Sequence, residues 1–128
     1  MAYYINRTIA CPFDTAIARV TEELQKEGFG ILTEIDVKAT LKKKLGVDFR
    51  NYRILGACNP PFAYQALQAE PKIGTMLPCN VIVEEIDAAT CEVSAVDPLA
   101  SMQAIDNPAL QGIALQIQAK LRQVITRL

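Results

Sequence analysis

The sequence predicts an α+β fold over residues 1–128, a two-layer sandwich with helices packed on a mostly antiparallel five-stranded sheet. Three observations support this prediction. Strand-like and helix-like segments alternate through the first half of the chain, and a hairpin follows late in it. In addition, 51% of the 128 residues are hydrophobic, which suffices for one core and one domain. A doubly wound parallel sheet is the alternative.

The first strand and helix are predicted from residue type and spacing. Residues 3–9 are aromatic and β-branched, as in a strand, and Pro12 then suits the first turn of a helix that Gly28 ends. That helix has one apolar stripe, made of Phe13, Ile17, Val20 and Leu24. Residues 29–35 predict a second strand, whose alternation places on one side Phe29, Ile31, Thr33 and Ile35.

A short helix should follow between Asp36, as its cap, and Gly46. Its expected buried stripe is Val37, Leu41 and Leu45. The lysines between them, Lys38 and residues 42–44, then form a solvated face rather than an anion site, because acidic residues elsewhere balance their charge.

The second half contains one more strand, at residues 52–58, before a hairpin formed by residues 79–86 and 91–96. A helix from Asn59-Pro60-Pro61 to about Glu70 lies between them. A symmetric hairpin pairs Ile86 with Cys91, Glu84 with Val93, and Asn80 with Asp97. Periodicity leaves open which hairpin face is buried.

Two helices should complete the chain, a short one that begins at Asp97-Pro98 and a long one that begins at Asn107-Pro108. The long helix carries a continuous apolar stripe for docking on the sheet or on a partner: Leu110, Ile113, Ile117, Leu121, Val124 and Leu128.

Composition argues against several classes of function. The formal charge of -1 provides no excess of cations for nucleic acid or an anionic membrane. The chain has no histidine, the commonest general base and zinc ligand, and none of its four cysteines forms a Cys-x-x-Cys pair. We therefore expect a soluble, cytoplasmic protein with reduced thiols, no cofactor, and no nucleic-acid or membrane partner.

The dipeptide Cys-Asn occurs twice, as Cys58-Asn59 and Cys79-Asn80, each time at the end of a strand-like run beside proline. A thiol near a helix N-terminus can be reactive, although a strand cysteine is more often buried and inert. With Asp97, which precedes Pro98 in the same way, these four residues are the candidate ligand-binding set.

A structural role is the competing interpretation of several of these residues. Asn59, Asp97 and Asn107 each precede proline at a predicted helix start, where the side chain can cap the helix. The carboxylates near the strands are also more typical of solvated faces or caps than of acid-base catalysis: Glu34, Asp36, Glu84 and Glu85.

Four segments, in this order, resemble the bacterial and archaeal domain of unknown function 302. They are residues 28–41 (GFGILTEIDVKATL), 52–60 (YRILGACNP), 77–81 (LPCNV) and 96–98 (VDP). The resemblance covers essentially the whole chain. It implies a single α+β domain that forms a dimer, and it brings no established activity, substrate, cofactor or catalytic residue.

Three functional hypotheses follow. The leading one is a non-enzymatic homodimer that binds or senses a small molecule in a pocket near the two Cys-Asn pairs. The second is a thiol-based redox or sulfur-carrier protein that uses Cys58 or Cys79. The third is binding of a soft metal, the cuprous ion, by the same thiols. All three hypotheses require the sulfur atoms of Cys58 and Cys79 to lie close together at one accessible end of the sheet.

Overall fold

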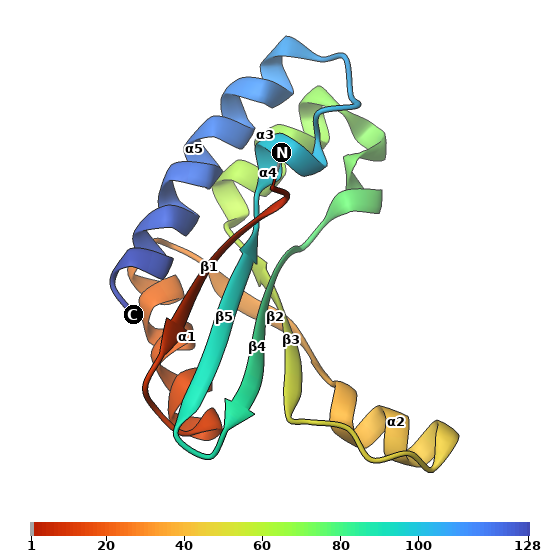
Figure 1. The fold of residues 1–128 in the computed structure, drawn as a ribbon. Coiled ribbons are helices and arrows are strands. Elements are labelled where there is room, and N and C mark those ends of the chain that lie inside the picture. Colours follow the sequence, from red (N-terminus) through yellow and green to blue (C-terminus); the bar gives the residue numbers. More distant parts are fainter. Residues whose placement is uncertain (1) are drawn as a thin grey trace.

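Five strands form one antiparallel sheet in the computed structural model, which describes residues 2–128 (Figure 1). The strands are β1 (Tyr4–Ile9), β2 (Gly30–Asp36), β3 (Tyr52–Cys58), β4 (Cys79–Asp87) and β5 (Thr90–Val96). Their order is β1-β5-β4-β3-β2, and every neighbouring pair is antiparallel. The predicted α+β sandwich is confirmed, and the parallel alternative is wrong.

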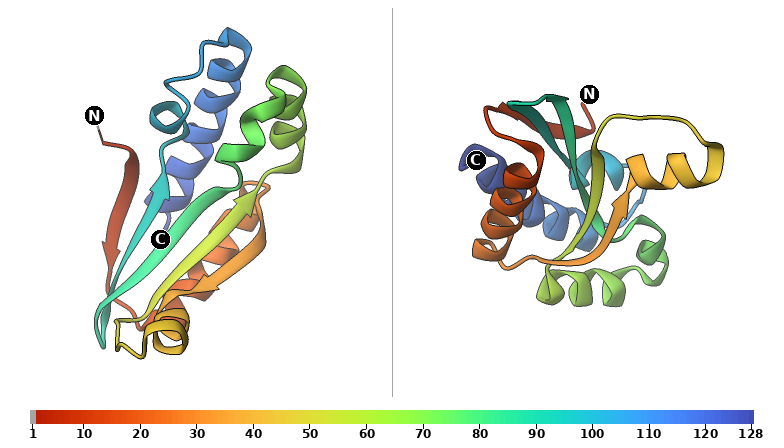
Figure 2. Two further views of the ribbon diagram at one scale, coloured as in Figure 1. Left: turned by 90° about the vertical axis from the view of Figure 1, so that its right-hand side faces the viewer. Right: turned by 90° about the horizontal axis from the view of Figure 1, so that it is seen from below.

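The helices follow the predicted places closely. They are α1 (Phe13–Lys26), α2 (Val37–Leu45), α3 (Pro60–Ala69), the 3-10 helix η1 (Pro71–Met76), α4 (Pro98–Ser101) and α5 (Pro108–Thr126). Two views show α1 and α5 on the same side of the sheet, with α2 projecting away from them (Figure 2). Among residues 2–128, no helix is both long and apolar enough to cross a membrane.

The core lies between the sheet and the helices α1 and α5. From the sheet it takes the inward residues of β4 and β5, including Val81, Val83 and Val93, none of which is exposed. All six residues of the predicted stripe in α5 are buried, as the 3.6-residue period requires. The opposite face of the sheet has no helical layer in Figure 1. We call it the open face, and it carries Tyr4, Tyr52, Ile54, Asn80, Ile82, Glu84, Glu92 and Ser94.

The predicted alternation of β2 is wrong because the strand contains a bulge at Leu32. Ile31 pairs with Ala57, whereas Thr33 pairs with Gly56, so the register shifts between them. An extra residue reverses which side chains face the core. Thr33 and Ile35 consequently lie on the open face, opposite to Ile31.

A second bulge, near Ile86, changes the hairpin register from the symmetric one. Asp87 pairs with Thr90, but Glu85 pairs with Cys91 and Glu84 with Glu92, which excludes the predicted pairing of Asn80 with Asp97. The structure also answers which hairpin face is buried. Cys79 and every second residue after it to Val83 point toward the helices.

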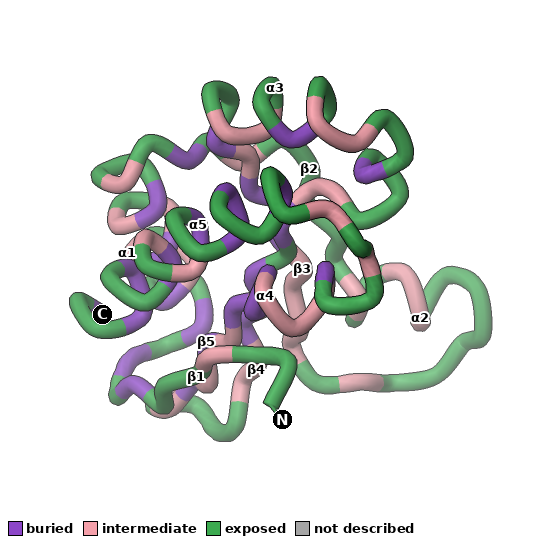
Figure 3. Tube along the Cα trace, turned by 90° about the horizontal axis from the view of Figure 1, so that it is seen from above, coloured by how far each residue is buried: buried purple, intermediate pink, exposed green. Residues whose placement is uncertain are grey.

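Helix α2 forms where predicted, but its expected buried stripe is wrong. Asp36 accepts a hydrogen bond from the Ala39 amide at 2.9 Å, and Gly46 ends the helix with φ +67°. No residue of α2 is buried (Figure 3). Leu45 is 70% exposed. Leu45 is exposed, and Val37 and Leu41 are only half-buried, because α2 projects beyond the end of the sheet and away from the helical layer (Figure 1).

Candidate functional site

A pocket of about 330 Å³ lies where β3 ends and β4 begins. We call it the thiol pocket, because its lining includes Cys58 and Cys79. Phe29 and Leu32 line it from the start of β2, and α3, η1 and α5 contribute further apolar side chains. The pocket therefore lies at one end of the sheet, and α2 lies at the other end of β2 and β3.

Three of the five predicted site residues line this pocket: Cys58, Asn59 and Cys79. The register explains why residues so distant in sequence meet. Cys79 pairs with Ala57, so Cys58 and Asn59 follow directly after the residue that faces it. Leu77 and Pro78, which precede Cys79, complete this part of the wall.

The two thiols differ in their environment. Cys79 is only 6% exposed, and its burial, together with nearby Cys58, raises the pKa of its thiol to about 11. Cys79 is therefore a protonated, apolar contact at neutral pH. Cys58 is half-buried at the end of β3, directly before Asn59 and the start of α3, and is the more accessible of the two.

Asn59 does not cap α3, so that prediction is wrong. Its side-chain nitrogen instead donates to the Glu27 carbonyl oxygen at 3.0 Å, and its side chain makes no cap hydrogen bond. Glu27 and Gly28 end α1, where Gly28 has φ +86°. A side chain at Gly28 would be strained in this left-handed conformation and would lie 3.2 Å from the Asn59 nitrogen. The amide thus ties the end of α1 to the pocket wall.

Asp97 lies outside the pocket and has a structural role. One carboxylate oxygen accepts from the Leu99 amide at 3.0 Å, which caps α4. Gln118 of α5 donates to both carboxylate oxygens, at 3.0 and 3.1 Å. Asn107 likewise accepts from the Ala109 amide at 3.2 Å. The cap predictions for Asp97 and Asn107 are confirmed.

Asn80 faces away from the thiol pocket. It is exposed on the open face, where it lines a separate hollow of about 400 Å³ with Tyr3, Tyr52 and Glu84. Successive strand residues point to opposite faces, so the inward direction of Cys79 dictates the outward direction of Asn80.

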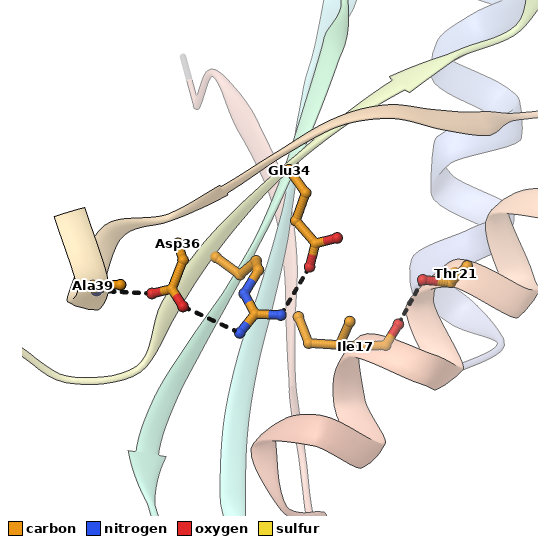
Figure 4. A network of polar contacts seen from close by, with 6 residues as sticks. Ile17, Thr21, Glu34, Asp36 and Ala39 are labelled. Atoms are coloured by element: carbon orange, nitrogen blue, oxygen red, sulfur yellow. Dashed lines mark hydrogen bonds and ion pairs between the residues drawn. The ribbon is translucent and has the colours of Figure 1, made fainter.

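The strand carboxylates are engaged by cations and amides. Arg53 donates to Glu34 at 2.8 Å and lies 3.6 Å from Asp36, so one guanidinium joins both carboxylates (Figure 4). Arg50 donates to Glu84 at 2.5 Å, and Asn51 donates to Glu85 at 3.3 Å. These contacts are ion pairs and a side-chain hydrogen bond, and Asp36 also caps α2, which fits the structural interpretation of the four carboxylates.

The fold and the pocket define a two-layer α+β domain with an apolar cavity at the end of its sheet. The chain belongs to the family of domain of unknown function DUF302, whose model matches residues 5–128. A crystal structure of an uncharacterized conserved DUF302 protein from Bacillus stearothermophilus is similar to it, with a TM-score of 0.91 and 29% identity over 99% of this chain and 98% of that one. No curated protein matches the chain.

Sequence reasoning missed much of the pocket lining. Ile113 and Ile117 were predicted as part of the stripe in α5 that faces the sheet, but nothing in the stripe indicated a cavity beside them. Leu32 lines the pocket from the bulge, and Met102 reaches it from the end of α4. A bulge has no dependable signal in a single sequence, so Leu32 could not have been predicted.

Proposed function

We propose that this domain is a non-enzymatic binding protein for a small, uncharged, apolar molecule that occupies the thiol pocket. The observation that carries the proposal is the convergence of Cys58, Asn59 and Cys79 on a cavity to which residues 2–128 contribute no charged side chain. Its volume of about 330 Å³ is in the range of small-molecule sites. An apolar cavity of this kind favours an apolar ligand, because burying an unpaired charge there would be costly.

The experiment uses N-phenyl-1-naphthylamine, an uncharged probe that fluoresces in apolar surroundings. We expect saturable binding to one site per chain. Ala63 lies on α3 and lines the pocket, so Ala63→Phe should fill the cavity and weaken binding at least about tenfold. Ala18→Phe, at an exposed position of α1, is the matched control and should bind as the unaltered protein does. Unsaturable binding, or equal binding by Ala63→Phe, would contradict the proposal.

A thiol-based function is the second candidate, and the accessible position of Cys58 is the observation in its favour. The register gives less support to a disulfide with Cys79. Cys58 follows Ala57, which faces Cys79, so the two cysteines are not directly paired, and both thiols are free. The raised pKa of Cys79 also disfavours its thiolate at neutral pH.

Thiol labelling with iodoacetamide, followed by mass spectrometry, separates these candidates. For a binding protein we expect slow labelling of Cys58, faster than that of Cys79, and protection of Cys58 by the bound probe. Rapid labelling of one thiol would favour redox or sulfur-carrier chemistry. Protection of both thiols by cuprous ion would favour the soft metal. Within residues 2–128, no group of three or more potential metal-binding side chains adds to the two thiols.

We also propose that the domain works as a cytoplasmic homodimer that pairs through the open face. Apolar and aromatic side chains remain exposed there, with Tyr4 43% and Ile35 48% exposed. Ile54 lies at the middle of this face, between Ile35 and Ile82.

Light scattering on the protein as it elutes from a size-exclusion column tests the dimer and should give twice the 14.1 kDa chain mass. Ile54→Arg should give one chain mass, and Ala18→Arg should stay dimeric. A monomeric unaltered protein would exclude the dimer.

A further inference from the structure

The Asn59 side chain leaves one polar atom without a hydrogen-bond partner in residues 2–128, and solvent still reaches that atom. Asn59 is 7% exposed, and its nitrogen is committed to the Glu27 carbonyl oxygen at 3.0 Å. That contact fixes the orientation of the amide, because a carbonyl oxygen only accepts and must therefore face the nitrogen. Within residues 2–128, no donor forms a hydrogen bond with the remaining atom, the Asn59 oxygen.

The surroundings of this oxygen make it distinctive. Among the described residues that line the thiol pocket, only Asn59 has an amide, hydroxyl or charged side chain. The others are aliphatic, aromatic or sulfur-containing, apart from Gly74. At the start of α3, Pro60 and Pro61 lack amide hydrogens, and the Phe62 amide forms no cap hydrogen bond with the Asn59 side chain. A ligand that fills the pocket shuts this oxygen off from water, and an acceptor in apolar surroundings then loses free energy unless the ligand supplies a donor.

We propose that the ligand of the thiol pocket is an uncharged, apolar molecule with a hydrogen-bond donor, such as a hydroxyl or an amide N-H, that reaches the Asn59 oxygen. This inference rests on the proposed function and specifies its ligand class. An ether, ester or ketone of the same size lacks the donor and leaves the oxygen unpaired. A carboxylate would place its charge among apolar side chains and would face another acceptor.

The test compares three molecules as competitors of bound N-phenyl-1-naphthylamine: 1-octanol, heptyl methyl ether and octanoate. The alcohol and the ether are isomers, and the ether is at least as apolar, so apolar burial alone predicts equal or better binding of the ether. We expect half-displacement by octanol at a concentration about five- to tenfold lower than by the ether, as one net hydrogen bond gives. Octanoate should compete least.

Two variants test whether the preference for octanol over the ether depends on Asn59. Asn59→Leu removes the acceptor and should abolish the preference for octanol over the ether. Asn80→Leu changes the other Cys-Asn asparagine, on the open face, and should keep the preference. Asn59→Leu also loses the hydrogen bond to Glu27. If this variant does not fold, the comparison of octanol with the ether on the unaltered protein decides whether the inference holds.

Equal competition by the isomers, or stronger competition by octanoate, would overturn this inference while the apolar site itself remains. A preference for octanol that survives in a folded Asn59→Leu variant would overturn it as well. Absence of any saturable probe binding would instead overturn the proposed function and this inference together.

Discussion

Gly56 shows how one absent side chain shapes the pocket wall. It lies in the middle of the sheet, paired with Thr33 on one side and Asn80 on the other. A Cβ atom there would collide with the Thr33 hydroxyl and lie 2.7 Å from Pro78 Cγ. Thr33 and Pro78 therefore close over the glycine, and Pro78 also lines the thiol pocket. Glycine is required here by space, since its φ is not positive.

Gly56→Ala should destabilise the protein by about 3 kcal/mol, because the added methyl group forces apart the side chains of Thr33 in β2 and of Pro78, just before β4. Gly30→Ala is the control: Gly30 also lies in a strand, and nothing lies within 4 Å of the added atom. Its effect should stay within about 0.5 kcal/mol. Urea unfolding measures both. A Gly56→Ala protein as stable as Gly30→Ala would show that the side chains of Thr33 and Pro78 move aside freely.

The sequence predicted the pocket-lining role correctly for both residues at the end of β3. Cys58 and Asn59 lie where β3 stops, so strict alternation no longer separates them, and both line the pocket. Cys79 and Asn80 lie within β4, where alternation must place them on opposite faces. The sequence could not show that the amide of Asn59 would bind Glu27 rather than α3, because that contact spans 32 residues.

The secondary-structure elements were predicted more reliably than their faces. The 3.6-residue stripe of α5 and the proline-led helix starts gave correct elements, since both depend on local chemistry. The predicted sides of β2 and the predicted register of the hairpin were wrong because each contains a bulge, at Leu32 and near Ile86. One extra residue reverses a period of two, and a single sequence carries no clear sign of it.

Helix α2 and helix α1 should respond differently to the same substitution. Leu45→Ala in α2 removes a side chain that is 70% exposed and should cost less than about 0.5 kcal/mol. Leu24→Ala in α1 removes a fully buried one and should cost about 2 to 5 kcal/mol. Thermal or urea unfolding of the two variants checks this. A comparable loss for Leu45→Ala would mean that another surface covers α2 in solution.

The stability of the whole molecule should fall in alkaline solution through Cys79. In the unfolded chain this thiol ionises near its ordinary pKa of 9.0, whereas in the folded protein it stays protonated to about 11. Below pH 9 both states hold the proton, so the group has no effect there. Between pH 9 and 11 only the unfolded state releases it, which favours unfolding by up to about 2 to 3 kcal/mol.

Urea unfolding of the unaltered protein and of Cys79→Ala, each at pH 8 and pH 11, measures this contribution. Tyrosines and lysines also titrate in this range, so the informative quantity is the difference between the two proteins. The variant should be less stable at pH 8, because it loses a buried side chain, and should lose less stability on going to pH 11. Parallel curves would show that Cys79 ionises alike in both states.

The strands β2 and β3 also separate two regions of the molecule with opposite tolerance to change. The thiol pocket lies at one end of these strands, and the exposed α2 lies at the other, about 20 Å away for seven extended residues. A fluorophore, affinity tag or surface anchor attached at Leu45 would report on the protein without touching the cavity. The projecting helix α2 is therefore a suitable attachment site for immobilising the domain while ligands are screened.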